Sequence, residues 1–226
     1  MAIKIKKTGN VHEDGIKCLV YGKGGIGKTT LMGTAPKPIV LSCESGMLAL
    51  ADKNIPYIEI QTVEEIYEAY DYLMSSKGKR YETICLDSVS EIAELVLSDL
   101  KKQYKDARQA YGELAEEVTT LVRKFRDIKG KNVIFSAKQK RITDEDTGLT
   151  QYVASMPGNN LTNSMPFFFD EVFYMTLHEK DDGKEVRVLK TQTSFDHDAK
   201  DRSGKLKKLE LPNLTRIFNK ISKGDK

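Results

Sequence analysis

The chain has 226 residues, of which 39% are hydrophobic and 31% are charged, and its net charge is +3. This length accommodates one large domain, or a domain with a small appendage, around a buried core. No apolar run approaches the roughly 20 residues that a membrane-spanning helix requires, and the N-terminus lacks the apolar segment of a secretion signal. We therefore expect a cytoplasmic protein with no membrane role.

The charge is unevenly distributed along the chain. Between residues 200 and 226, nine Lys and Arg residues stand against three acidic residues, whereas the whole chain has 36 Lys and Arg against 33 Asp and Glu. A basic end of this kind either attracts a polyanion or is simply solvated, and both interpretations stay open. The three cysteines, Cys18, Cys43 and Cys85, match no metal-binding spacing and lie in apolar segments, so we expect buried, reduced thiols.

Segments typical of strands and of helices alternate over the first part of the chain. After a polar lead-in over 1–15, apolar runs predict strands at 16–21, 38–43, 57–60, 83–87 and 132–137. Helices are predicted at about 29–33, from 62 to about 76, from 88 to about 100 and at about 107–129. Strands that alternate with helices form βαβ units. The predicted fold class is therefore α/β, with a mostly parallel central sheet flanked by helices.

The pattern changes after Arg141. Residues 144–148 predict a hairpin turn, and 155–166 predict a polar loop. Two strands, 171–178 and 185–189, enclose a turn and predict a C-terminal antiparallel hairpin, and a last short helix is expected near 213–221. We expect three parts, which are the lead-in over 1–15, a core over 16–205, and a short basic C-terminal helix and tail over 206–226.

The segment from Gly22 to Thr30 fills every fixed position of the phosphate-binding loop, Gly-x4-Gly-Lys-Thr, between a strand and a helix. Glycines let consecutive backbone N–H groups converge on a phosphate. Lys28 is expected to reach the β- and γ-phosphates, and the Thr29 hydroxyl is expected to bind Mg²⁺. We predict that the chain binds ATP with Mg²⁺ through Gly22, Lys23, Gly24, Gly25, Ile26, Gly27, Lys28, Thr29 and Thr30.

Two acidic residues stand at the ends of predicted strands. Asp87 ends the apolar strand 83–87, as in a Walker B segment, and is expected to join Thr29 in the Mg²⁺ shell. Glu44 follows the strand 38–43, and a glutamate there can polarise the attacking water. The carboxyl ends of parallel strands are where α/β sheets bind ligands, so both acids are expected in one site. Lys28, Glu44 and Asp87 are the candidate catalytic residues.

A third strand end carries candidates for sensing the γ-phosphate. The strand 132–137 continues into Lys138 and Gln139. A polar side chain there can contact the γ-phosphate and transmit its presence to the following segment. The residue pattern does not distinguish between Lys138 and Gln139, and solvated polar residues leaving a strand are an equally open interpretation.

Together these motifs resemble the RecA-type ATPase core. In particular, they resemble the small RecA-like ATPases of phages that are related to the Sak-type single-strand annealing proteins and to RadA. The resemblance covers about 16–205 and depends mainly on Gly22–Thr30, with Glu44 at the second strand and Asp87 in the Walker B strand. It implies a RecA-like P-loop NTPase fold and DNA-stimulated ATP hydrolysis in phage recombination or annealing.

The same resemblance implies partners. It makes 141–166 the DNA-contacting loop, although the acids at 144–146 oppose phosphate contact. It also implies a homo-oligomeric ring or filament, in which Lys190, Lys200 and Arg202 of one subunit reach the γ-phosphate bound by the next. Single-stranded DNA is the expected partner, and a single-strand binding protein is a further candidate.

Two other classes of protein fit parts of the sequence. Lys23 also matches the deviant Walker A loop of the ParA/MinD positioning ATPases, in which that lysine crosses a dimer interface. The second strand ends here in Cys-Glu-Ser-Gly, however, and the C-terminal segment has no strongly amphipathic membrane helix. A small-molecule kinase would have an arginine-rich lid, whereas 141–166 contains only Arg141.

Overall fold

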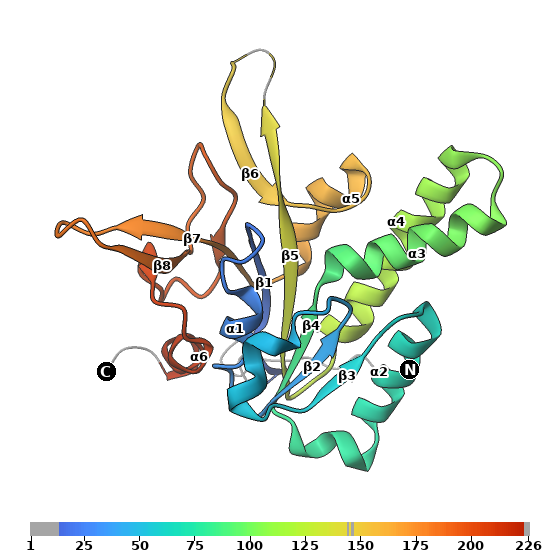
Figure 1. Ribbon diagram of the computed structural model, residues 1–226, viewed down its shortest axis with the longest axis horizontal. Coiled ribbons are helices and arrows are strands. Elements are labelled where there is room, and N and C mark those ends of the chain that lie inside the picture. Colours follow the sequence, from blue (N-terminus) through green and yellow to red (C-terminus); the bar gives the residue numbers. More distant parts are fainter. Residues whose placement is uncertain (1–13, 144, 146, 224–226) are drawn as a thin grey trace, which may run out of the picture.

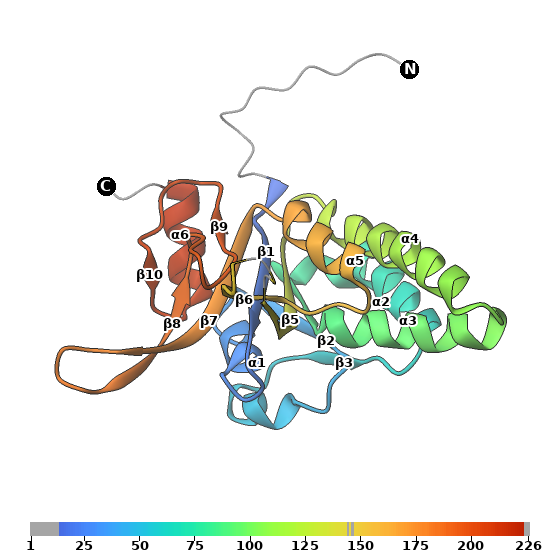
Figure 2. The ribbon, with the colours of Figure 1, turned by 90° about the horizontal axis from the view of Figure 1, so that it is seen from above.

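A single twisted sheet organises the protein, and helices cover both of its faces (Figure 1; Figure 2). The computed structural model describes residues 14–143, 145 and 147–223. Within them the sheet has ten strands in the order β10-β8-β7-β1-β5-β4-β2-β3, with β6 beside β5 and β9 beside β7. The parallel strands are β1 (Lys17–Gly22), β2 (Pro38–Ser42), β3 (Tyr57–Glu59), β4 (Thr83–Asp87), β5 (Asn132–Thr143) and β7 (Glu171–Glu179). The antiparallel strands are β6 (Thr150–Ala154), β8 (Glu185–Lys190), β9 (Lys200–Asp201) and β10 (Leu209–Glu210).

Strand β1 lies at the centre of the sheet, between β5 and β7. Every residue of β1 is buried, because layers of helices cover both faces of the sheet at this point. Its side chains alternate between two cores, with Leu19 and Tyr21 in the larger core and Cys18 and Val20 in the smaller one. This explains why the segment is a continuous apolar run and does not alternate with polar residues.

The helices divide between the two faces. The larger core is covered by α2 (Val63–Met74), α3 (Val89–Gln103), α4 (Ala107–Arg126), α5 (Asn159–Ser164) and η4 (Met165–Phe168). The smaller core is covered by α1 (Lys28–Met32), η2 (Met47–Lys53) and α6 (Leu214–Lys223), and the short helix η3 (Ser76–Arg80) follows α2. Helix α6 thus packs on the same core as β1. In the described part of the chain, no helix combines the length and apolar character needed to cross a membrane.

The predicted fold class is confirmed. The sheet is mostly parallel and flanked by helices, and β7 and β8 form the antiparallel hairpin expected near the C-terminus. The capping box at the start of α2 is also present, since the Thr62 hydroxyl accepts from the Glu65 N–H and the Glu65 carboxylate accepts from the Thr62 N–H. The division of the chain into three parts, with boundaries at 15/16 and 205/206, stays a prediction.

Two local predictions were wrong. Residues 155–166 are not a continuous loop, because α5 forms within them and buries Leu161 and Thr162. Its sequence is rich in Asn, Thr and Ser, which are weak helix formers, so packing overrides local preference. Strand β5 does not end at Ala137 but continues to Thr143. Its outer half pairs with β6 as a two-stranded ribbon, in which exposed polar side chains replace the apolar run that marks a buried strand.

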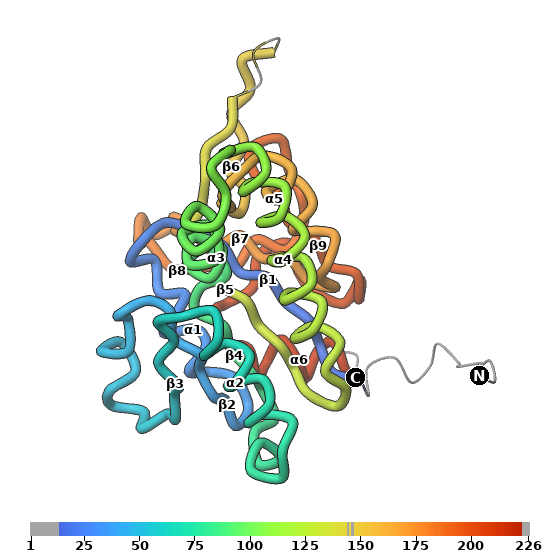
Figure 3. Tube along the Cα trace, turned by 90° about the vertical axis from the view of Figure 1, so that its right-hand side faces the viewer, coloured from blue at the N-terminus to red at the C-terminus, as the bar shows by residue number. Residues whose placement is uncertain are grey.

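Two hairpins project from the body of the protein. The β5–β6 ribbon rises beyond the ends of the other strands, and the β7–β8 hairpin extends sideways from the sheet (Figure 1). The side view in Figure 3 shows the ribbon standing clear of the helices. Both hairpins begin near the carboxyl ends of the parallel strands, which is the edge where the candidate site lies.

Candidate nucleotide-binding site

The loop that connects β1 to α1 has the backbone geometry that its glycines permit. Gly25 and Gly27 have φ angles of 76° and 107°, a region that L side chains rarely adopt. A Cβ at Gly22 would lie 2.5 Å from the Met175 carbonyl oxygen, so the close approach of the β7 backbone also requires glycine at this position. A Cβ at Gly24 or Gly25 would instead meet no atom within 4 Å, which leaves the loop open to a ligand.

Lys28 folds back over this loop. Its ammonium group donates to the carbonyl oxygens of Gly22 at 3.1 Å and Lys23 at 3.3 Å. Burial lowers the pKa of Lys28, while the nearby carboxylates of Glu44 and Asp87 oppose the shift. The cation predicted to bind the β- and γ-phosphates is therefore within electrostatic range of both predicted acids.

Asp87 is the centre of a buried hydrogen-bond network, and only 1% of its surface is exposed. Its Oδ2 accepts from the Thr29 hydroxyl at 2.6 Å, and its Oδ1 accepts from the Ser136 hydroxyl at 2.5 Å. The structure thus brings Thr29 and Asp87 together, as their predicted shared role requires. Ser136 was missed from the sequence. A serine in the otherwise apolar run of β5 could have revealed it, because β5 lies between β1 and β4.

Glu44 lies beside Asp87, half-buried in the turn that follows β2. The backbone N–H groups of Cys43 and Glu44 donate to the Asp87 carbonyl oxygen at 2.7 and 3.2 Å, which joins the ends of β2 and β4. The Glu44 carboxylate accepts from the Ser88 hydroxyl at 2.5 Å. Ser88, a second residue missed in this role, also accepts from the Glu91 N–H as the N-cap of α3, so its capping contact and its contact with Glu44 coexist.

The two candidate sensing residues occupy different positions. Lys138 forms an ion pair with Glu91, and this hydrogen bond raises the pKa of Lys138. Its positive charge also reaches Lys28, whose pKa it helps to lower. Gln139 lies one residue further along β5 and pairs with Ala154 of the ribbon. The sensing role of either residue stays a prediction.

The three candidates for action on a neighbouring subunit lie on β8 and at β9. Lys190, at the end of β8, is 3.4 Å from Asp196. Lys200 donates to the Pro166 carbonyl oxygen at 2.7 Å, and Arg202 pairs with Asp170 at 2.8 Å. Lys200 belongs to β9 and Arg202 follows it, and β9 pairs with the start of β7 at the amino edge of the sheet.

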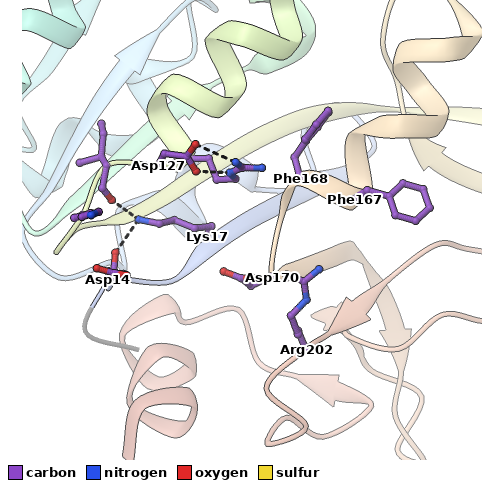
Figure 4. Close-up of a pocket in the computed structure, with 11 residues that line it drawn as sticks. Asp14, Lys17, Asp127, Phe167, Phe168, Asp170 and Arg202 are labelled. Carbon is purple, nitrogen blue, oxygen red and sulfur yellow. Dashed lines mark hydrogen bonds and ion pairs between the residues drawn. The ribbon is translucent and has the colours of Figure 1, made fainter. Parts of the chain in front are cut away.

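At that amino edge, Arg202 and Asp170 line an open cavity of about 360 Å³ together with Lys17 and Phe167 (Figure 4). Lys200 and Arg202 therefore lie at the opposite end of β1 from Gly22. A contact with the phosphates bound by the same chain is excluded for these two residues by this placement. Their role in a neighbouring subunit stays a prediction.

A comparison with protein families identifies the family of this chain. The family model described as an AAA domain matches residues 14–203, which include the loop, both carboxylates and the whole parallel sheet. The chain belongs to the AAA domain family. No curated protein gives a significant match. Among solved structures, a KaiC-like protein from the hyperthermophilic archaeon Pyrococcus horikoshii aligns over 78% of each chain, with 13% identity and a TM-score of 0.40, a likeness too distant to support a conclusion.

AAA domains are P-loop ATPases, which in general use a nucleotide and Mg²⁺, and the residues of this AAA domain fit both. The open side of Gly24 and Gly25 leaves room for phosphates. The Thr29 hydroxyl and the Asp87 carboxylate are 2.6 Å apart and offer oxygen ligands, which Mg²⁺ prefers. Among the described residues, no three His, Cys, Asp or Glu side chains converge as a metal site. A P-loop ion needs no such cluster, because phosphate oxygens and water complete its shell.

Proposed function

We propose that this AAA domain hydrolyses ATP in a Mg²⁺-dependent reaction. The proposal rests on two hydrogen-bonded pairs that lie together at the phosphate loop, Thr29 with Asp87 and Ser88 with Glu44. The first pair has the donor set for Mg²⁺, and the second holds a carboxylate at the neighbouring strand end. A site with only the first pair would be equipped to bind a nucleotide, and the second pair supplies a base for its hydrolysis.

Each residue has a defined task in this reaction. Mg²⁺, when bound, would neutralise the charge that develops on the β- and γ-phosphates. Asp87 and Thr29 would hold that ion, and the Ser136 hydroxyl fixes the rotamer of Asp87 by occupying its second oxygen. Lys28 brings a positive charge to the same phosphates. Glu44 accepts a proton from the attacking water, and Ser88 orients the Glu44 carboxylate for that transfer.

We further propose that the protein acts on single-stranded DNA in phage recombination or annealing. Support comes from β5, which passes beside Asp87 at Ser136 and then continues into the projecting ribbon. The ribbon carries Lys138, Lys140 and Arg141, and cations of this kind bind phosphates of a nucleic-acid backbone. A ligand that binds the ribbon would therefore act on a strand that forms part of the nucleotide site. The resemblance to RecA-like ATPases also supports a homo-oligomer, and the free cysteines support a cytoplasmic location.

The test compares ATP turnover with and without single-stranded DNA for the wild-type protein and for a Lys140→Ala/Arg141→Ala variant. The Arg141 side chain is exposed and the Lys140 side chain is half-buried, and neither belongs to a hydrophobic core, so the fold should be retained. We expect DNA to stimulate the wild-type protein, and we expect the variant to keep its basal rate while losing most of the stimulation. Lys184→Ala, at the tip of the β7–β8 hairpin, removes a cation elsewhere and serves as the control. A wild-type rate that does not respond to DNA would contradict the DNA role and leave the ATPase proposal standing.

A further inference from the structure

An arginine of the β7–β8 hairpin lies against the phosphate loop. A Cβ placed on Gly27 would lie 3.6 Å from both Cδ and Nε of Arg187, and 3.4 Å from Cε of Met175. The Arg187 side chain is exposed. In the part of the chain that the structure describes, no hydrogen bond or ion pair engages its guanidinium group. A planar cation beside the loop is thus available to a ligand.

The face of the hairpin that meets the loop changes character along its length. Cross-strand partners share a face, and the register pairs Met175 with Leu189 and Leu177 with Arg187. Met175 and Leu189 are buried in the smaller core, whereas 46% of Leu177 is exposed. Where the hairpin passes the loop, its face therefore presents one apolar side chain and one guanidinium group to solvent.

The order of the strands indicates which part of a nucleotide this face would meet. On one side of β1 lie β5, β4 and β2; β4 ends in Asp87, and Glu44 lies in the turn after β2. The Mg²⁺ ligands and the base for water belong to the β- and γ-phosphates, so that end of the nucleotide lies toward β4 and β2. The nucleoside must then leave the loop on the other side of β1, where β7 and β8 lie.

We propose that Arg187 and Leu177 form the wall against which the base of the bound nucleotide stacks, an inference that rests on the proposed ATP site. A guanidinium plane stacks on aromatic faces, and an adjacent leucine extends the contact with apolar surface. This assigns Arg187 to binding of the nucleoside and gives it no part in the chemistry at the γ-phosphate. Lysine has no such plane and cannot replace the arginine in this contact.

The test measures dissociation constants of ATP and ADP, in the presence of Mg²⁺, for wild-type protein, Arg187→Ala and Arg187→Lys. Inorganic tripolyphosphate is measured by displacement of a fluorescent ADP, because it carries the phosphates without a base. We expect both variants to bind ATP and ADP about tenfold more weakly, and by the same factor, since both nucleotides carry the same base. Tripolyphosphate should bind all three proteins equally. Arg216→Ala, which removes an exposed arginine from α6, should behave as the wild type.

Three outcomes would overturn the inference. Unchanged ATP affinity in Arg187→Ala would remove the residue from the site. Weaker binding of ATP alone, or of tripolyphosphate as well, would assign Arg187 to the phosphates. Wild-type affinity in Arg187→Lys would show that charge suffices without stacking. Wild-type protein that binds no nucleotide would contradict both this inference and the proposed site, whereas binding without turnover would contradict the hydrolysis alone.

Discussion

Asp87 shows how a single side chain joins several elements at this site. Its two carboxylate oxygens accept from Thr29 at the start of α1 and from Ser136 of β5, and its carbonyl oxygen accepts from the turn after β2. Three segments that are far apart in sequence are thereby held around one carboxylate. Because every oxygen of Asp87 has a fixed partner, its carboxylate is oriented before any ligand binds.

A second buried acid, Glu171 at the amino edge, should make stability depend on pH. Burial, together with the negative charges of Asp201 and Asp170, raises the pKa of Glu171 to about 9 from its ordinary value of 4.5. Protonated Glu171 therefore belongs to the folded state, and its contribution is fully present below about pH 4.5 and is lost as pH rises through about 9. Between these pH values, the ionisation of Glu171 should lower the free energy of unfolding of the wild-type protein by up to about 1.4 kcal/mol per pH unit. Glu171→Gln should not show this decrease.

The measurement is urea unfolding of wild-type protein and of Glu171→Gln at pH 5, 7 and 9. The difference in free energy of unfolding between the two proteins should grow in favour of the variant as pH rises. Parallel curves for the two proteins would show that Glu171 titrates at an ordinary pKa.

Residues of this site differ in how well the sequence predicts them. Asp87 and Glu44 are acids at the ends of apolar runs, so strand pattern alone places them at one edge of a parallel sheet. Ser136 and Ser88 are small polar residues whose partners lie 49 and 44 positions away. Their contacts depend on which strands are neighbours, which no local pattern contains. Arg187 is similar, because its approach to Gly27 depends on the position of β7 beside β1.

Strand β5 is the element that links the nucleotide site to the projecting ribbon. The Ser90 hydroxyl, near the start of α3, accepts from the Lys138 N–H at 3.0 Å and donates to the Ser155 carbonyl oxygen at 2.7 Å. Ser155 in turn donates its N–H to the Lys138 carbonyl oxygen. One buried hydroxyl thus joins α3 to both sides of the base of the ribbon.

Replacing Ser90 by alanine should destabilise this base. The change leaves the Lys138 N–H and the Ser155 carbonyl oxygen without their Ser90 partner, which we expect to lower the free energy of unfolding by about 1–3 kcal/mol. Chemical denaturation measures this, with Ser45→Ala as the control because Ser45 is exposed. A loss equal to that of the control would mean that Ser90 does not fasten the ribbon. Since the ribbon transmits DNA binding in our proposal, stimulation by DNA should fall in Ser90→Ala as well.

The same strand shows the limit of prediction at the level of elements. The inner half of β5 is a buried apolar run and is predicted correctly, whereas the outer half has only β6 as its partner and its side chains are exposed or half-buried. Helix α5 is missed for the opposite reason, because its weak local preference is overridden by the burial of Leu161 against the larger core. Both errors concern segments whose structure depends on a neighbour.

At the scale of the whole molecule, the charged groups separate onto two edges of the sheet. Lys28, Glu44 and Asp87 lie at the carboxyl edge, whereas Lys200 and Arg202 lie at the amino edge with Asp170. In an assembly that stacks one edge on the other, the amino-edge cations of one subunit would face the phosphates bound by the next. This arrangement is a prediction, and it makes activity depend on two subunits.

Mixing two inactive variants tests this dependence. Lys28→Ala should lack a working loop but still supply Arg202, and Arg202→Ala should have a working loop but lack the cation. We expect each to be inactive alone and the mixture to recover part of the wild-type ATPase rate, with a native mass above that of one chain. Arg126→Ala, which changes another arginine of the same cavity, is the control. Full activity of Arg202→Ala, or a mixture that stays inactive, would contradict the shared site.

The central claim, that Glu44 and the phosphate loop form one hydrolytic site, is tested most directly by measuring ATP binding and turnover of Glu44→Gln. Glutamine keeps the shape of the side chain and its contact with Ser88 but cannot accept a proton from water. Glu59→Gln, at the end of the neighbouring strand β3, is the matched control because Glu59 is exposed. We predict that Glu44→Gln binds ATP as the wild type does and turns it over at least about 100-fold more slowly, while the control is unaffected. Wild-type turnover by Glu44→Gln would contradict it.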